Sequence, residues 1–173
     1  PDLLDSINKL KNCNYNWIIK FHSLMDESIR KRYKKLESNN FCVVDELNIL
    51  PFMAGSDIMI TDTSSVAYEF LSFDRPLITY KAIARKYKGI NIQHPTELSS
   101  AIERSLMNPD EFSTNRARCL SEIHPYSDGH SSNRMLKVIE TILTEGLHNE
   151  LKQKPLNFLR KYQIRKIIAR SEA

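Results

Sequence analysis

Three consecutive hydroxyl side chains, those of Thr63, Ser64 and Ser65, lie between an apolar run and a helical pattern. The apolar run ends at Asp62 and predicts a buried strand, and residues 66–71 begin the helical pattern. A helix N-terminus presents unpaired N–H groups and about half a positive charge, so it attracts anions. Although a single Ser or Asp there is often only a helix cap, three hydroxyls indicate a phosphate site. Asp62 is interpreted as a structural cap.

Two further polar groups follow apolar runs. His22 ends the run over residues 17–21, and Asp45 and Glu46 follow the run over residues 41–44. A histidine in this position is either a hydrogen-bonded residue at the edge of the core or a group that acts on a phosphate. Asp45 is either the cap of the next helix or a residue that lines a base or ribose pocket.

A basic group surrounds Tyr87 and consists of Arg85, Lys86 and Lys88. Such a group contacts phosphates or an anionic acceptor when it lies at a ligand site. The other interpretation is a solvated charged face, which is the usual role of a run of charges.

Short apolar runs alternate with helical patterns over residues 1–108. Strands are predicted for residues 17–21, 41–44, 58–61, 76–80 and 89–92. Helices are predicted for residues 2–11, 26–37, 47–55, 64–73 and 96–107, and then for 109–122, 130–145 and 149–170. Continuous apolar runs joined by helix-length segments are typical of parallel strands with right-handed crossovers. The predicted fold class is α/β, a Rossmann-like parallel sheet of about five strands flanked by helices, with a helical C-terminal part.

Three segments in order carry a resemblance to a known family. They read IIKFH at residues 18–22, GSDIMITDTSSVAYEF at residues 55–70 followed by DRPLI at 74–78, and YSDGHSSNR at residues 126–134. Together they resemble the CDP-glycerol glycerophosphotransferase family of teichoic acid synthesis, and the resemblance covers roughly residues 1–145.

The resemblance implies one lobe of a GT-B-type enzyme, the C-terminal lobe that binds the nucleotide donor. The whole enzyme would transfer a glycerol-phosphate-like or glycosyl group from a CDP-glycerol-like donor to a cell-wall or capsule polymer precursor. It implies no metal and no other cofactor. By position, the resemblance assigns the catalytic histidine to His22, the donor phosphates to Thr63, Ser64 and Ser65, and the donor pocket to Asp45, Glu69, Asp128, Gly129 and Arg134.

The chain departs from the family pattern at several positions. Ser23 follows His22 where the family has Pro, Thr63 stands in place of Tyr, and Glu69 replaces Asp. The segment over residues 81–89 is shorter than in the family. The family's N-terminal acceptor lobe would precede Pro1, so this chain alone is expected to have no transferase activity.

Two other functions remain open at the level of sequence. A UDP-GlcNAc 2-epimerase-like enzyme shares the strand, turn and helix that bind phosphate, but typically has Ser-Gly-Gly at the turn. A noncatalytic nucleotide-binding module is the second alternative, and a second Rossmann-like half upstream would argue against it.

The charge of the chain is unevenly distributed. Residues 151–173 carry seven Lys and Arg against Glu172, a net charge of +6, which leaves −2 for the rest of the total of +4. A nucleic-acid partner is therefore not predicted, because the body of the domain is not basic. We expect a domain over residues 1–146 and a basic amphipathic tail over residues 147–173, which packs on the other lobe, contacts anionic lipid or is solvated.

The three cysteines predict neither a zinc site nor disulfides. They are widely spaced and odd in number, a pattern that suits a reducing cytoplasm, and Cys42 in its apolar run is expected to be a small core residue. No apolar run reaches the roughly 18 residues of a membrane span. The expected location is the cytoplasm, with the inner face of the cell membrane as a candidate peripheral surface.

Overall fold

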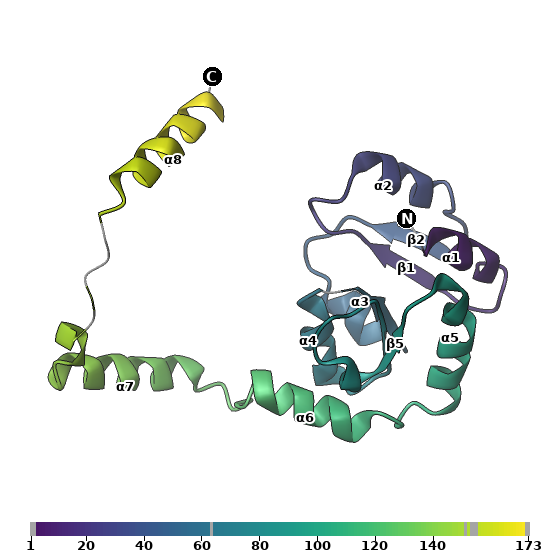
Figure 1. Ribbon diagram of the computed structural model, residues 1–173. Helices are drawn as coiled ribbons and strands as arrows, with labels where there is room; N and C mark the ends of the chain where they lie inside the picture. The colour runs from purple at the N-terminus through teal and green to yellow at the C-terminus, as the bar shows by residue number, and fades with distance from the viewer. Residues whose placement is uncertain (1–2, 63, 151, 153–155, 172–173) are drawn as a thin grey trace. The chain divides into compact units, whose positions relative to one another are not determined.

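The computed structural model describes residues 3–62, 64–150, 152 and 156–171 (Figure 1). Contacts within the chain divide it into two compact units, one that ends at Pro125 and one that begins at Tyr126. The predicted tail boundary after residue 146 lies inside the second unit and stays a prediction.

The first unit alternates helices and strands in the predicted order. Its helices are α1 (Leu4–Leu10), α2 (Glu27–Lys34), α3 (Leu50–Gly55), α4 (Val66–Phe70), α5 (Leu98–Met107) and α6 (Ser113–Ile123). Its strands are β1 (Trp17–Lys20), β2 (Phe41–Val44), β3 (Met59–Thr61), β4 (Leu77–Tyr80) and β5 (Ile90–Ile92). Short 3-10 turns are η1 (Leu71–Phe73), η2 (Lys86–Lys88) and η3 (Pro95–Glu97). The predicted α/β class is confirmed.

Every strand pairing among the described residues is parallel, but the hydrogen bonds form two groups rather than one continuous sheet. β1 pairs with β2, and β4 lies between β3 and β5. Side chains join the two groups where backbone hydrogen bonds do not, because Trp17 and Phe41 share a core with Ile78 and Ile92. The two groups of strands therefore share one hydrophobic core.

Helices pack against the strands through apolar residues that recur at helical spacing. In α5 the buried residues Leu98, Ala101, Ile102 and Ser105 recur at intervals of three and four, and the helix runs beside β5 in Figure 1. A second core gathers Phe70, Leu71, Leu77 and Cys119 from α4, η1, β4 and α6, among others.

The packing requires a glycine at one position. A Cβ atom built on Gly89 would lie 2.0 Å from the backbone oxygen of Leu77 in β4. At Gly89 the backbone lies so close to the Leu77 carbonyl of β4 that a residue with a side chain would not fit.

β2 corrects the expectation for Cys42. Phe41 and Val44 are buried, whereas Cys42 is exposed, as is Cys13, and Cys119 is buried. The apolar run at residues 41–44 suggested a strand covered on both faces, but β2 leaves Cys42 exposed although Val44, which points to the same face, is buried.

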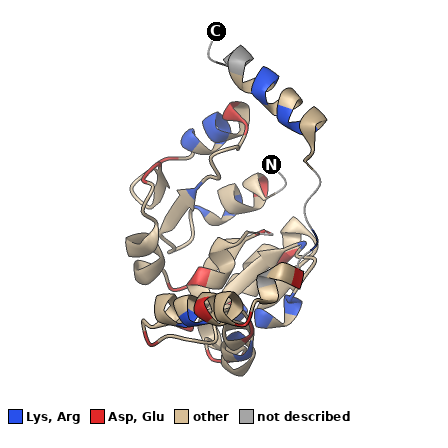
Figure 2. Cartoon of the chain, turned by 90° about the vertical axis from the view of Figure 1, so that its left-hand side faces the viewer, with Lys and Arg blue, Asp and Glu red and all other residues tan. Residues whose placement is uncertain are grey.

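The second unit contains α7 (Ser131–Thr144), η4 (Leu147–Glu150) and α8 (Phe158–Ser171). α7 places Met135, Val138 and Ile139 on one exposed apolar stripe. In α8, Phe158 and Ile167 are nine positions apart and point to opposite sides, so its apolar residues do not share one face. Figure 2 shows its basic residues in blue between uncharged ones. No helix in the described ranges is both long and apolar enough to cross a bilayer.

Candidate functional site

The hydroxyl turn follows β3. Thr63 lies outside the described residues. Ser64 is half-buried, and its Oγ accepts a hydrogen bond from the Val66 amide at 3.4 Å. Ser65 is exposed and immediately precedes α4, and its side chain makes no capping hydrogen bond. The Ser65 hydroxyl is therefore accessible at the surface of the turn.

The same turn corrects two details of the sequence interpretation. Ser64, and not Asp62, supplies the side-chain oxygen that accepts from the start of α4. The predicted helix over residues 64–73 is a five-residue α-helix followed by η1. Its dipole is correspondingly short, so an anion here would depend on the local N–H and O–H groups.

His22 lies in the turn after β1 and is exposed. Its Nδ1 accepts a hydrogen bond from the Leu24 amide at 3.2 Å, and its carbonyl oxygen accepts one from the Met25 amide at 3.0 Å. A neutral imidazole that accepts through Nδ1 carries its proton on Nε2. The ring therefore presents an N–H donor, which suits contact with a phosphate oxygen.

Asp45 follows β2 and is exposed. Its carboxylate lies 3.2 Å from the Lys34 ammonium and 3.9 Å from the Arg30 guanidinium, both on α2. The capping interpretation is wrong, because α3 begins at Leu50, whose amide donates to the side chain of Asn48. Because β1 and β2 are parallel neighbours, His22 and Asp45 follow the same edge of the pair.

Arg30 is the residue that sequence reasoning missed in this region. Its guanidinium connects the turn that contains His22 with the Asp45 carboxylate. The kind of group that Arg30 contacts explains why the sequence did not indicate it. Most of its partners are backbone carbonyls of a turn, which leave no signal in the order of residue types.

Glu69 is exposed on α4. Two cationic side chains lie near the ring of the preceding residue, Tyr68. The ring of Tyr68 has the Arg85 guanidinium at 5.7 Å and the Lys88 ammonium at 5.4 Å from its centroid. Lys88 is 4% exposed and donates to the Arg85 carbonyl, so the solvated-face interpretation is wrong for this lysine. The basic group thus connects the segment before β5 to α4.

Glu122 of α6 neutralises part of this basic group. It lies 3.5 Å from Arg85 and 3.1 Å from Arg118, and it accepts a hydrogen bond from the Tyr87 hydroxyl at 2.8 Å. That hydrogen bond to Glu122 raises the pKa of Tyr87 to about 12. Tyr87 therefore stays protonated and holds η2 against α6.

Asp128, Gly129 and Arg134 come together at the start of α7. Arg134 binds both carboxylate oxygens of Asp128, one of them at 2.8 Å, and the His130 amide donates to the same carboxylate. Gly129 has φ of +73°, the left-handed conformation that favours glycine. The hydrogen bond from Arg134, joined by that of His130, lowers the pKa of Asp128 to about 2.

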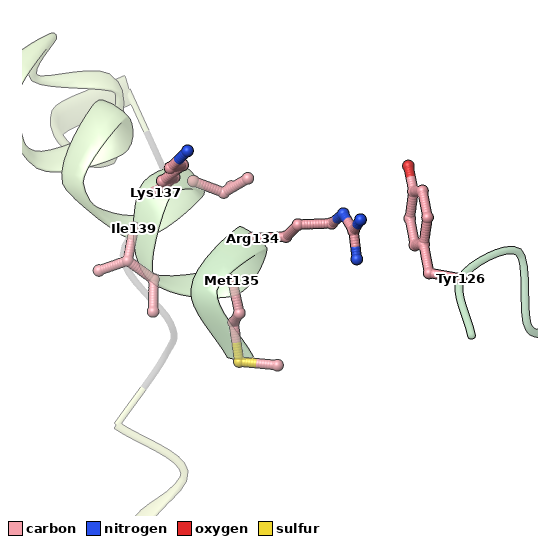
Figure 3. Close-up of a pocket in the computed structure, with 6 residues that line it drawn as sticks. Tyr126, Arg134, Met135, Lys137 and Ile139 are labelled. Atoms are coloured by element: carbon pink, nitrogen blue, oxygen red, sulfur yellow. The ribbon is translucent and has the colours of Figure 1, made fainter. Parts of the chain in front are cut away.

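An aromatic ring completes this group. The Arg134 guanidinium lies 3.9 Å from the centroid of the Tyr126 ring, toward which it extends in Figure 3. Met135, Lys137 and Ile139 line the same surface hollow. The hollow combines an ion-paired guanidinium, an aromatic face and apolar side chains.

The structure thus brings the predicted residues together in three groups. His22 and Asp45 are linked through Arg30, Ser64 and Ser65 form the turn before α4, and Asp128, Gly129 and Arg134 form the turn before α7. The first two groups belong to the first unit and the third to the second unit. Within the described ranges, no three His, Cys, Asp or Glu side chains gather as a metal site would require.

An α/β chain whose parallel strands end in polar turns belongs to the large class that binds ligands beyond the carboxyl ends of its strands. Comparison with known proteins gives a narrower identity. The chain belongs to the CDP-glycerol:poly(glycerophosphate) glycerophosphotransferase family, whose model matches residues 3–141. The family resemblance inferred from the three motifs is confirmed.

Curated relatives agree with this assignment. The chain is similar to the teichoic acid glycerol-phosphate primase of Bacillus subtilis, at 25% identity over 149 residues, which are 80% of this chain and 38% of that protein. It is also similar to the teichoic acid ribitol-phosphate primase of Bacillus spizizenii, at 27% identity over 158 residues, which are 84% of this chain and 39% of that protein. The chain therefore spans well under half the length of these relatives.

Proposed function

We propose that this chain is the donor-binding lobe of a polyol-phosphate transferase of teichoic acid synthesis, with a CDP-glycerol-like donor. The observation that carries the proposal is the family match over residues 3–141, which contains all three groups of candidate residues. It also favours a transferase over the 2-epimerase-like and noncatalytic alternatives. The acceptor would be a cell-wall polymer precursor bound by a separate lobe.

The donor phosphates are assigned to the turn at Thr63, Ser64 and Ser65. The exposed Ser65 hydroxyl and the Nε2–H of His22 are the donors best suited to phosphate oxygens. Asp45 and Glu69 are assigned to the donor pocket, as are Asp128, Gly129 and Arg134.

The reaction requires a leaving group that carries negative charge. An acceptor hydroxyl would attack the phosphorus that bears the glycerol, the bond between the two phosphates would break, and CMP would leave with that electron pair. The hydroxyl proton would pass to a base, and His22 would donate its Nε2–H to a phosphate oxygen, because its Nδ1 accepts from the Leu24 amide. Hydrogen-bond donors fixed around the phosphates would stabilise the charge that develops on the leaving group.

Ligand binding by this chain tests the assignment directly. Thermal shifts with CDP-glycerol, CDP-ribitol, CMP, UDP and UDP-GlcNAc should show selectivity for cytidine nucleotides. Replacing Ser64 and Ser65 together by Ala should weaken binding by roughly tenfold or more, since a hydrogen bond to a charged group contributes about 1.5–3 kcal/mol.

The matched control is a pair of consecutive serines at the start of another helix of the first unit. Ser99 and Ser100 lie at the start of α5, and their hydroxyls bond within that helix and the turn before it. The variant with both changed to Ala should keep the parent affinity. Equal shifts with uridine nucleotides, or none with any nucleotide, would contradict the proposal.

The role of His22 is tested by measuring donor turnover in the full-length, active form of the protein. His22→Ala should lower turnover of the donor by roughly 100-fold, within the range for loss of one fixed hydrogen-bond donor to the developing charge. Normal turnover by this variant would remove His22 from the mechanism.

A further inference from the structure

One guanidinium holds the whole turn after β1. Arg30 on α2 donates from Nε to the Met25 carbonyl at 3.2 Å. Its Nη2 donates to the carbonyls of His22 and Ser23 at 2.8 and 3.1 Å. The third nitrogen, Nη1, lies 3.9 Å from Asp45. All three guanidinium nitrogens therefore have partners, and three of these partners are successive or nearly successive carbonyls of one turn.

The arrangement depends on the planar fork of arginine. Arg30 has only 20% of its side chain exposed, and its guanidinium lies 5.7 Å from the centroid of the Phe21 ring. Phe21 directly follows β1 and is buried, so the guanidinium is held between the core and the turn. A lysine offers one point charge and cannot make the same set of hydrogen bonds.

The turn after β1 also fixes the position of the His22 imidazole. The Leu24 amide that donates to Nδ1 belongs to the same turn, as does the Met25 amide that donates to the His22 carbonyl. If the turn moves, the Nδ1 acceptor loses its partner. The position of the Nε2–H donor then changes with it.

We propose that Arg30, itself oriented by Asp45, is a positioning residue that holds His22 in the Nε2–H form and directs the ring toward the donor phosphates. The second part of this inference rests on the proposed function, in which His22 contacts the donor. The first part concerns the ligand-free protein and is tested without any ligand.

The ligand-free test is the protonation pattern of the His22 ring, measured by long-range nitrogen–proton NMR at a pH where the ring is neutral. The parent should show the Nε2–H form with a protected Leu24 amide. Arg30→Lys and Arg30→Gln should give a mixture of the two neutral forms and faster exchange at Leu24. Arg32→Gln, an exposed position on the same helix, is the matched control and should leave both signals unchanged.

Two outcomes would overturn the positioning role. One is a mixture of ring forms already present in the parent. The other is an unchanged His22 signal in Arg30→Lys. Arg30→Lys keeps a positive charge and a long apolar stem over Phe21, so this variant is expected to fold. It therefore still decides the question if Arg30→Gln does not fold.

The ligand test is a double-mutant cycle on CDP-glycerol affinity. Arg30→Lys should weaken binding about tenfold, within the roughly 100-fold that an ångström-scale misplacement can cost. In a His22→Ala background the same change should cost less than twofold, since Arg30 acts through His22. Additive losses would overturn this link. If His22→Ala alone leaves affinity unchanged, the proposed role of His22 in donor binding fails, and the NMR measurement still decides the role of Arg30.

Discussion

Asp128 and Arg134 form the most strongly perturbed ion pair in the described part of the second unit, at the turn that precedes α7. The pKa of Asp128 is lowered to about 2 from an ordinary value of 3.8, chiefly by the hydrogen bond from Arg134. A carboxyl with a lowered pKa stabilises the folded state above its ordinary pKa and loses this contribution as pH falls. The window for this pair therefore lies between about pH 4 and pH 2.

We predict that a carboxyl-carbon NMR titration of Asp128 has its midpoint near 2. Arg134→Gln should move this midpoint up toward 3.8, and the N-terminal turn of α7 should then loosen at a higher pH. Lys137→Gln removes the same charge from the same helix without touching the pair, so it should leave the midpoint in place. A midpoint near 3.8 in the parent would show that the pair does not form in solution.

The residue types and spacing were sufficient to propose His22, Ser64 and Ser65 as candidates, because hydroxyls and a histidine after apolar runs are visible in the sequence. They were not sufficient to find Arg30, whose partners are carbonyl groups in a turn. They also left the cap of α3 open as one role for Asp45, but the loop before α3 is long enough that Asn48 accepts from the start of that helix instead.

At the level of elements, Gly89 sets the approach of β5 to β4. Gly89→Ala should lower the free energy of unfolding by about 1–3 kcal/mol or more, because its Cβ would overlap the Leu77 carbonyl. Urea denaturation measures the effect.

Gly55 is the control for this prediction. It ends α3, and a Cβ there would meet nothing within 4 Å. Gly55→Ala should therefore be neutral or stabilise the protein by up to about 1 kcal/mol, as is usual for this change in a helix. Equal destabilisation by both substitutions would contradict the contact with Leu77.

Arg116 attaches α6 to the turn that follows η1. It is 1% exposed and donates to the Asp74 carboxylate at 2.7 Å, to the Asp74 carbonyl at 2.9 Å and to the Pro109 carbonyl at 3.1 Å. Arg116→Ala should lower the free energy of unfolding by about 3 kcal/mol, because it removes three hydrogen bonds and leaves a cavity.

The comparison for Arg116 is its neighbour Arg118, which has 70% of its side chain exposed and pairs with Glu122. Arg118→Ala should change the free energy of unfolding by no more than about 0.5 kcal/mol. Similar losses for the two variants, in thermal or urea denaturation, would show that burial does not decide the role of Arg116.

The strands and most helices were predictable because each carries a hydrophobic period of its own. The break between α4 and η1 was not. It arises where the Asp74 amide donates to the Leu71 carbonyl and Asp74 takes a left-handed conformation, so the last turn tightens. The separation of the strands into groups of two and three likewise depends on long-range packing that no local pattern contains.

For the whole molecule, the concentration of positive charge in residues 151–173 is the feature that bears on location. Peripheral contact with an anionic membrane on the cytoplasmic side is our proposal for this segment. We predict that the protein floats with vesicles containing phosphatidylglycerol and not with neutral phosphatidylcholine vesicles. Changing both Lys161 and Arg165 to Glu should weaken binding by about 2 kcal/mol or more, since each basic residue contributes about 1 kcal/mol.

The matched control reverses two charges at the same spacing in the first unit. Lys31 and Lys35 are exposed and four positions apart, as Lys161 and Arg165 are. The variant with Glu at positions 31 and 35 should float like the parent. Equal loss in the two variants would indicate a response to net charge alone, and no flotation of the parent would remove the membrane proposal.

The outward side chain of Cys42 offers a practical use. It is an exposed thiol on β2, three positions before Asp45, whereas Cys119 is buried and should resist maleimide reagents. With Cys13 changed to Ser, a fluorophore could be attached at Cys42 alone. Its emission would then report, in real time and without a radioactive donor, whether a nucleotide arrives at the neighbouring strand end.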